Sequence, residues 1–217
     1  MADAGPALRK KKKTKLFNLE IDGVKQTVWV RQLWTYKWKA KSGLPAWDAK
    51  QKKTFHKQIE AAIRKTWSGK LVLEATGKSD FAQAMKGKTL TVFFDVDSVS
   101  SGAHYTVIAN KIPAGTWSGS KVSPSKMVMN IDTEDMKPEK KPGSSKGDKQ
   151  TVASHEFGHT IKAAGWSDEY KPGHVNKSDV RSIMNVGSKV RKRHGAHICS
   201  ELSKMIPDTT FTVKSVK

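Results

Sequence analysis

The fold of this chain is decided by residues 151–165, which read TVASHEFGHTIKAAG. The run predicts a helix that ends at its last glycine, because glycine commonly occupies the position after a helix. His155 and His159 are four residues apart, so both imidazoles lie on one face of that helix. Phe157 and Ile161 fall on the opposite face by the same geometry. We therefore expect the apolar face to pack on the domain and the imidazoles to face a cleft.

The spacing His-Glu-x-x-His at residues 155–159 suits a divalent metal ion. Two imidazoles one helical turn apart can bind the same Zn²⁺ ion, and Glu156 stands next to the first of them. The chain has one cysteine, Cys199, so neither an internal disulfide nor a cysteine-based zinc site can form. Any metal must therefore be bound by histidines and carboxylates. Because so short a pattern also occurs by chance, the residues after the helix must support it.

Two further motifs follow this helix, Asp-Glu-Tyr at residues 168–170 and Ser-Ile-Met-Asn at residues 182–185. Together with the helix, they resemble the metzincin clan of zinc peptidases. In that clan a third metal ligand lies shortly after the helix, past a glycine, and a methionine-containing turn forms a floor under the metal. The order HEFGH, DEY, SIMN and then Arg-His at residues 193–194 is also similar to bacterial metzincin-like proteins, including effectors. The matching motifs cover residues 151–200.

The resemblance implies that Asp168 is the third protein ligand of a single catalytic Zn²⁺ ion. The clan's usual third ligand comes six residues after the second histidine, and that position is Gly165, which has no side chain to bind a metal. A three-residue insertion would move the ligand to Asp168. Glu169 and His174 are the alternative ligands. The other interpretation of the two neighbouring carboxylates is an acidic turn in contact with solvent.

Three protein ligands would leave one position for a water molecule, whose pKa zinc lowers to roughly 7. Glu156 would accept its proton as the water attacks a peptide carbonyl. Tyr170, His194 and His197 are candidates to donate a hydrogen bond to the oxyanion that develops, and each would also suit a structural role. The resemblance places Met184 below the metal, whereas a lone methionine is more often a packing residue.

Sequence patterns upstream of the motif helix predict a mixed α+β domain. The Asp-Gly pair at residues 22–23 separates two strand-like runs, residues 16–21 and 24–30, and indicates a hairpin. Apolar residues recur at helical spacing over residues 55–67 and predict a helix that ends before Gly69. Further strands are expected at residues 34–38, 90–96, 104–109 and 126–131, a loop at 136–150 and a last helix at 197–206.

The order of these elements favours a two-lobed α+β plan, which also fits a metzincin-like catalytic domain. Residues 1–15 are rich in lysine and are expected to form a disordered basic arm. Residues 16–217 would form a single domain. Its N-terminal lobe, residues 16–164, would hold a twisted sheet and helices, including the motif helix at 151–164. Its C-terminal lobe, residues 165–217, would be mostly irregular and helical and would contain the methionine turn.

The composition limits the cellular setting. No run reaches the roughly 18 apolar residues that a membrane helix needs. The basic cluster at residues 9–13 is not followed by the apolar stretch of a classical signal peptide. We therefore expect a monomeric chain without a transmembrane segment that is synthesised in the cytoplasm. The resemblance to effectors implies delivery by a specialised secretion or contractile injection system.

Two hypotheses of function follow. The first is a zinc-dependent endopeptidase that acts on a protein or peptide substrate, with an effector or toxin role implied by the resemblance. The second is a basic module that binds nucleic acid or another polyanion, in which the His-Glu-x-x-His motif is incidental or structural. It rests on the formal charge of +20, which attracts nucleic acid, acidic proteins or cell-wall polymers. A solvated basic surface without a partner explains the charge equally well.

Overall fold

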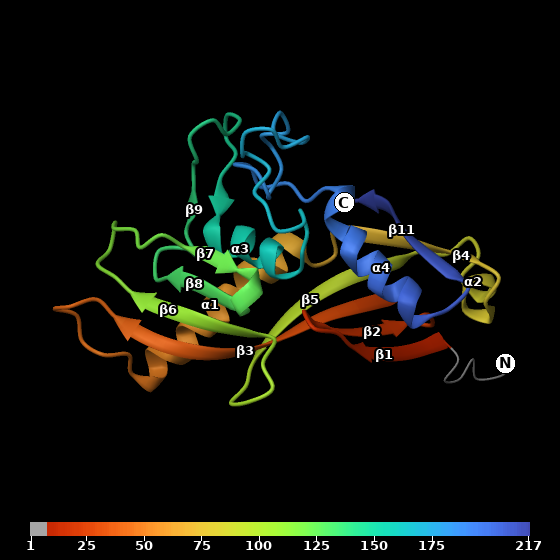
Figure 1. The fold of residues 1–217 in the computed structure, drawn as a ribbon, viewed down its shortest axis with the longest axis horizontal. Coiled ribbons are helices and arrows are strands. Elements are labelled where there is room, and N and C mark those ends of the chain that lie inside the picture. The colour runs from red at the N-terminus through yellow and green to blue at the C-terminus, as the bar shows by residue number, and fades with distance from the viewer. Residues whose placement is uncertain (1–7) are drawn as a thin grey trace.

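The computed structural model describes residues 8–217 and has a mixed α+β fold, with 24% helix and 33% strand. A long mixed sheet runs the length of the molecule, and helices α1, α3 and α4 pack around it (Figure 1). The expected α+β class is confirmed. In the described part of the chain, no helix has both the length and the apolar character needed to cross a bilayer.

The main sheet has the strand order β11-β4-β5-β3-β6-β8-β7, and the hairpin partners β1 and β2 join it through β3. Its strands are β1 Arg9–Lys13, β2 Asn18–Asp22, β3 Thr27–Ala40, β4 Leu71–Gly77, β5 Leu90–Ser98, β6 Tyr105–Lys111, β7 Lys121–Ser123, β8 Val128–Asp132 and β11 Thr209–Val216. A separate small sheet pairs β9 Pro138–Glu139 with β10 Gln150–Thr151.

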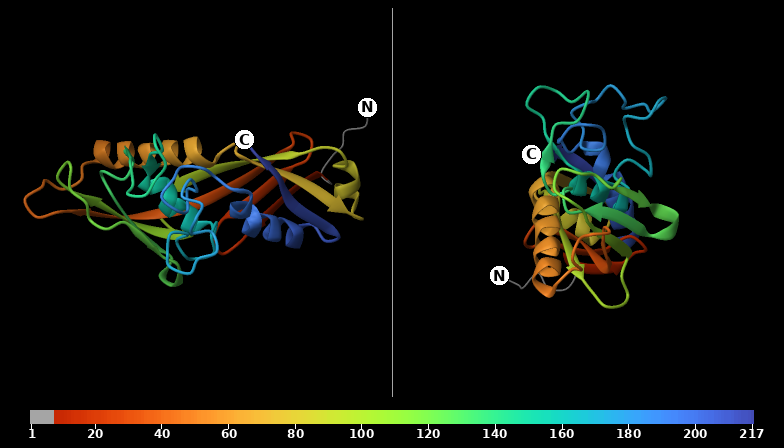
Figure 2. Two further views of the ribbon diagram at one scale, coloured as in Figure 1. Left: turned by 90° about the horizontal axis from the view of Figure 1, so that it is seen from above. Right: turned by 90° about the vertical axis from the view of Figure 1, so that its left-hand side faces the viewer.

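The helices are α1 Ala49–Trp67, α2 Asp80–Ala84, α3 Val152–Thr160 and α4 Ala196–Met205, with short 3-10 turns η2 Pro124–Lys126 and η3 Lys192–Gly195. The predicted helix over residues 55–67 is confirmed as part of α1. Asp48 begins it by accepting a hydrogen bond from the backbone of Gln51, as an N-cap residue does. Viewed from above, α1 runs alongside the long strand β3, and α4 lies across the molecule from it (Figure 2).

Strand β3 joins two segments that the sequence analysis kept apart. Its first half pairs with β2 and β5 and its second half with β6, so one strand serves the whole sheet. Alternate residues from Val28 to Trp34 are buried, and the polar residue Gln32 is among them. Its side-chain amide donates to the carbonyl oxygen of Leu16 and accepts from the Trp34 indole. A glutamine at a core position therefore hid the continuity of the apolar pattern.

The expectation of a disordered arm over residues 1–15 is corrected for residues 9–13. These residues form β1, which pairs antiparallel with β2. Backbone hydrogen bonds to the edge of the sheet order a run of lysines that cannot contribute a hydrophobic face. Two ion pairs add to this, Arg9 with Asp22 and Lys12 with Glu201 of α4. Residues 1–7 lie outside the described residues.

The C-terminal segment differs from the expected irregular lobe at residues 165–217. After α4 the chain forms β11, which pairs antiparallel with β4 and extends the main sheet. Phe211 of β11 is buried and packs against Phe81 of α2. The last third of the chain is therefore attached to the sheet that the first third builds, and the two predicted lobes share one core.

Helix α3 is shorter than the predicted helix over residues 151–164. It ends at Thr160, and the next turn is closed by a hydrogen bond from the Ala163 amide to the carbonyl oxygen of Gly158. Lys162 within this turn has φ 60°, a left-handed conformation that terminates helices. The early end turns the chain back over α3 and brings the next loop to its histidines.

Candidate metal centre

Three side chains converge at the C-terminal half of α3. His155 and His159 project from the helix, and Asp168 comes from the loop that follows it. The Oδ1 atom of Asp168 lies 3.0 Å from Nε2 of His155 and 2.9 Å from Nε2 of His159. The two Nε2 atoms are 3.3 Å apart. Among the described residues, this is the cluster of His, Cys, Asp and Glu side chains close enough to hold a metal ion.

The donor set and its spacing fit zinc. A tetrahedral Zn²⁺ ion with bonds of about 2.0–2.1 Å keeps its ligand atoms about 3.3–3.4 Å apart. The three candidate ligand atoms are separated by 2.9–3.3 Å, slightly less than this. Two imidazole nitrogens and one carboxylate oxygen also match the ligand types that zinc takes in catalytic sites. The residues present therefore fit one zinc ion.

The tautomer of His155 leaves its Nε2 lone pair directed at the cluster. Nδ1 lies 2.7 Å from the carbonyl oxygen of Ile183, which can only accept a hydrogen bond. We therefore assign the ring proton to Nδ1. A backbone carbonyl behind a ligating imidazole is the usual partner that fixes its orientation and its basicity.

Gln150, just before α3, holds the turn that supplies this carbonyl. Its side-chain nitrogen lies 2.9 Å from each of the carbonyl oxygens of Ile183, Asn185 and Gly187. Gln150 is buried, so these contacts replace water for the amide group. No sequence motif marks Gln150 as part of the site. A polar residue directly before the motif helix was the only feature of the sequence that pointed to Gln150. The fold shows which backbone groups its side chain contacts.

Met184 packs against α3 beside Gly158. Its side chain is fully buried. A Cβ atom added at Gly158 of α3 would lie 2.2 Å from the Met184 sulfur and 2.9 Å from the Trp67 ring. The helix and the turn are therefore in close contact, and the glycine between the two histidines makes the approach possible.

Glu156 is next to the first histidine and is 7% exposed. Burial raises the pKa of Glu156, whereas the two imidazoles and the backbone N–H of Val122 lower it, and the net shift is upward. Val122 belongs to β7, the strand at the edge of the main sheet. A carboxylate with a raised pKa beside the candidate metal ligands is suited to accept and release a proton.

Tyr170 stands at the exposed side of the cluster. Its ring stacks on His155 with centroids 6.4 Å apart, and its side chain is 46% exposed. Burial and the nearby Asp168 carboxylate raise the pKa of Tyr170 to about 12. The hydroxyl therefore stays protonated at neutral pH and can donate a hydrogen bond.

The alternative ligands Glu169 and His174 are not brought to the cluster. Glu169 is fully buried, and both of its carboxylate oxygens accept hydrogen bonds from Arg193, at 2.6 and 2.7 Å. His174 accepts a hydrogen bond from the backbone of Asn176 within its own loop. Asp168 is therefore the carboxylate that the structure assigns to the cluster. Burial alone would raise the pKa of Asp168, but the two imidazoles lower it well below its usual range.

His194 and His197 are also placed elsewhere. His194 is fully buried, and its Nε2 atom lies 3.3 Å from the Ser182 hydroxyl and 3.4 Å from Glu169. His194 therefore contacts the residue next to Asp168 and does not line the metal cluster. We correct its expected catalytic role to that of a residue that positions the Asp168 loop. His197 packs edge-on against Phe17 at the start of α4.

The two imidazoles, which were expected to face a cleft, are almost fully buried. His155 is 6% and His159 5% exposed, whereas the Asp168 side chain is 15% exposed. Solvent therefore reaches the cluster mainly from the side of Asp168 and the half-exposed Tyr170.

Taken together, the geometry defines a two-histidine, one-carboxylate centre of the kind that binds a divalent metal ion, with a fourth, acidic residue beside it. Comparison of the chain with protein-family models, with curated proteins and with solved structures finds no match.

Proposed function

We propose that this protein is a zinc-dependent endopeptidase with its active site at His155, His159 and Asp168. The observation that carries the proposal is the convergence of these three ligands on one point with Glu156 beside them. The same donor types also serve iron in some oxygenases. Zinc is favoured because both histidines and the glutamate come from a single His-Glu-x-x-His helix, the arrangement of zinc-dependent peptidases.

A bound zinc ion would polarise a peptide carbonyl and lower the pKa of water in its open coordination position. Glu156 would then take the proton from the attacking water and pass it to the leaving amine. Tyr170 donates a hydrogen bond to the oxygen on which negative charge develops. His155 keeps its orientation through the Ile183 carbonyl while this takes place.

Strand β7 offers a place for the substrate backbone. The strand expected at residues 104–109 corresponds to β6, which lies between β3 and β8 and therefore has no free edge. The edge of the sheet on this side is β7, whose Val122 contacts Glu156. An extended peptide that pairs with the free edge of β7 would pass in front of the glutamate. The proposal therefore predicts that the substrate is bound unfolded.

Replacement of Glu156 by glutamine tests this function. The Glu156→Gln variant should still bind about one zinc per chain, because the three ligands are unchanged. It should lose cleavage of a chemically unfolded, fluorescently labelled protein by about 10²–10⁴-fold, the usual contribution of a general base. Metal content is measured by elemental analysis, and cleavage is followed with and without a chelator.

The control is Glu139→Gln, an exposed carboxylate on β9, which should leave both zinc content and cleavage unchanged. If the Glu156→Gln variant cleaves as fast as the parent, Glu156 is not the general base and the proposed mechanism is wrong. Stoichiometric iron in place of zinc would assign the centre to another chemistry.

A further inference from the structure

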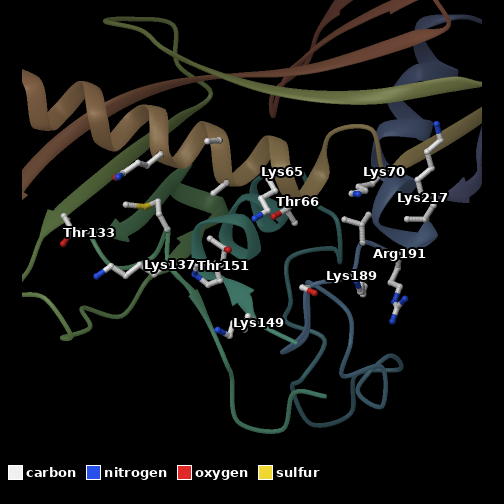
Figure 3. Close-up of a pocket in the computed structure, with 18 residues that line it drawn as sticks. Lys65, Thr66, Lys70, Thr133, Lys137, Lys149, Thr151, Lys189, Arg191 and Lys217 are labelled. Atoms are coloured by element: carbon white, nitrogen blue, oxygen red, sulfur yellow. The ribbon is translucent and has the colours of Figure 1, made fainter. Parts of the chain in front are cut away.

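A large basic cavity lies away from the metal centre. It has a volume of about 890 Å³, and none of the three candidate metal ligands lines it. Figure 3 shows side chains that approach it from α1, from the β9–β10 region, from the segment before η3 and from the C-terminal end of the chain. Volumes of this size are typical of sites for small ligands.

The charged side chains around this cavity are all of one sign. Seven lysine and arginine side chains line it, and no aspartate or glutamate side chain does. Two of the seven are neutralised by ion pairs, Lys137 with Glu134 and Arg191 with Asp179. The other five form no ion pair with any residue that the structure describes: Lys65, Lys70, Lys149, Lys189 and Lys217. Their mutual repulsion is relieved best by a ligand with several negative charges.

The chemistry of the lining points to phosphate groups. The Thr151 hydroxyl stands among the lysines and can donate to a phosphate oxygen, whereas the hydroxyls of Thr66 and Ser188 already donate to Ser154 and Asp148. No tyrosine, tryptophan or phenylalanine lines the cavity, so it offers no ring on which a nucleobase could stack. A ligand is therefore recognised through its charge and not through a base.

We propose that this cavity binds a compact oligophosphate, a small molecule with several adjacent phosphate groups, through Lys65, Lys149 and Lys189. These three lysines come from α1, from the residue before β10 and from the segment before η3, so they surround the ligand from different elements. A volume of about 890 Å³ matches a small ligand, whereas the backbone of a nucleic acid would be followed by basic residues along an extended surface. The site is independent of the proposed peptidase activity.

Titration of the protein with tripolyphosphate, followed by isothermal calorimetry, tests the site. The parent should bind one tripolyphosphate saturably and orthophosphate much more weakly. The triple variant Lys65→Gln/Lys149→Gln/Lys189→Gln should bind tripolyphosphate at least tenfold more weakly, and each single variant about threefold. All three lysines are exposed, so the fold should be retained, which circular dichroism verifies.

The matched control removes three exposed lysines elsewhere, Lys37→Gln/Lys86→Gln/Lys88→Gln. It carries the same net charge as the cavity variant and has the same metal ligands, so diffuse charge and any metal chelation by tripolyphosphate affect both alike. The control should bind within twofold of the parent. Equal weakening of both triple variants, or no saturable binding by the parent, would overturn the proposal. A 20-base-pair DNA duplex would be tested as a competitor. If the duplex displaces tripolyphosphate, and the cavity variant binds it as much more weakly as it binds tripolyphosphate, the ligand of this site is nucleic acid and the proposal is overturned.

Discussion

At the scale of single residues, the position of Asp168 depends on its neighbour, a fully buried carboxylate. Burial alone would raise the pKa of Glu169, but Arg193 and His194 lower it well below its usual range. The amide of Glu169 also donates to the carbonyl oxygen of Met184, at 2.9 Å. The loop that presents Asp168 is therefore tied both to η3 and to the turn at residues 182–187.

The first prediction at this scale concerns Arg193. In an Arg193→Gln variant, Glu169 keeps its burial and loses the partner of both oxygens. Removing one member of such a pair costs up to about 3–5 kcal/mol, because buried Glu169 would keep only the weaker contact with His194 and Asp179 would lose a partner too. We expect this loss in denaturant unfolding and a zinc affinity lowered by about 10–100-fold, as for other residues that support a metal ligand. The neighbouring exposed Lys192→Gln is the control, and equal losses in both variants would contradict the argument.

At the scale of elements, the site depends on the contact between α3 and the turn at residues 182–187. Gly158 faces the Met184 sulfur and the Trp67 ring, so a methyl group has no room there. A Gly158→Ala variant should be destabilised by about 1–3 kcal/mol in spite of the better helix propensity of alanine.

A double-mutant cycle with Met184→Ala separates this contact from other effects. If the added methyl group collides with the methionine, the double variant should lose less stability than the sum of the two single variants, by about 0.5 kcal/mol or more. Denaturant unfolding of the four proteins gives the coupling. Additive losses would show that the obstacle is Trp67 and not Met184.

The same elements show which parts of the site could be predicted. His155, Glu156 and His159 share one helix, so their spacing alone placed them together. Asp168 was found by resemblance, since no local pattern brings a residue of an irregular loop back over a helix. The contacts of Gln150 and Arg193 could not be predicted, because they join segments that are distant in sequence and depend on how the turn and the loop pack.

At the scale of the whole molecule, the helices and inner strands that were predicted correctly have apolar residues at regular spacing. The predictions failed for segments in which this spacing is interrupted or absent. Residues 9–13 are all basic, and their strand exists only because β2 offers a partner. Strand β11 has a weak pattern, and its place beside β4 is a long-range pairing that local sequence does not encode. Tertiary context therefore overrides local propensity near both ends of the described chain.

The pH dependence of stability is a property of the whole fold to which Asp135 should contribute measurably. Burial raises the pKa of this carboxyl to about 7, even though the Asp132 amide and the Ser120 hydroxyl donate hydrogen bonds to it. Because the folded pKa exceeds the unfolded value of 3.8, the protonated form favours folding. This contribution is fully present below about pH 4 and is lost as the pH rises through 7.

Asp135→Asn removes the titration and keeps a carbonyl oxygen for the Asp132 amide. Between pH 5.5 and 8.5 the parent should lose up to about 2 kcal/mol of unfolding free energy relative to the variant, since each pKa unit corresponds to about 1.4 kcal/mol. Urea unfolding of both proteins across this range measures the difference, with the exposed Asp80→Asn, which begins α2, as the control. Parallel pH profiles for parent and Asp135→Asn would mean that the carboxyl is ionised in the fold at neutral pH and that its two hydrogen bonds outweigh its burial.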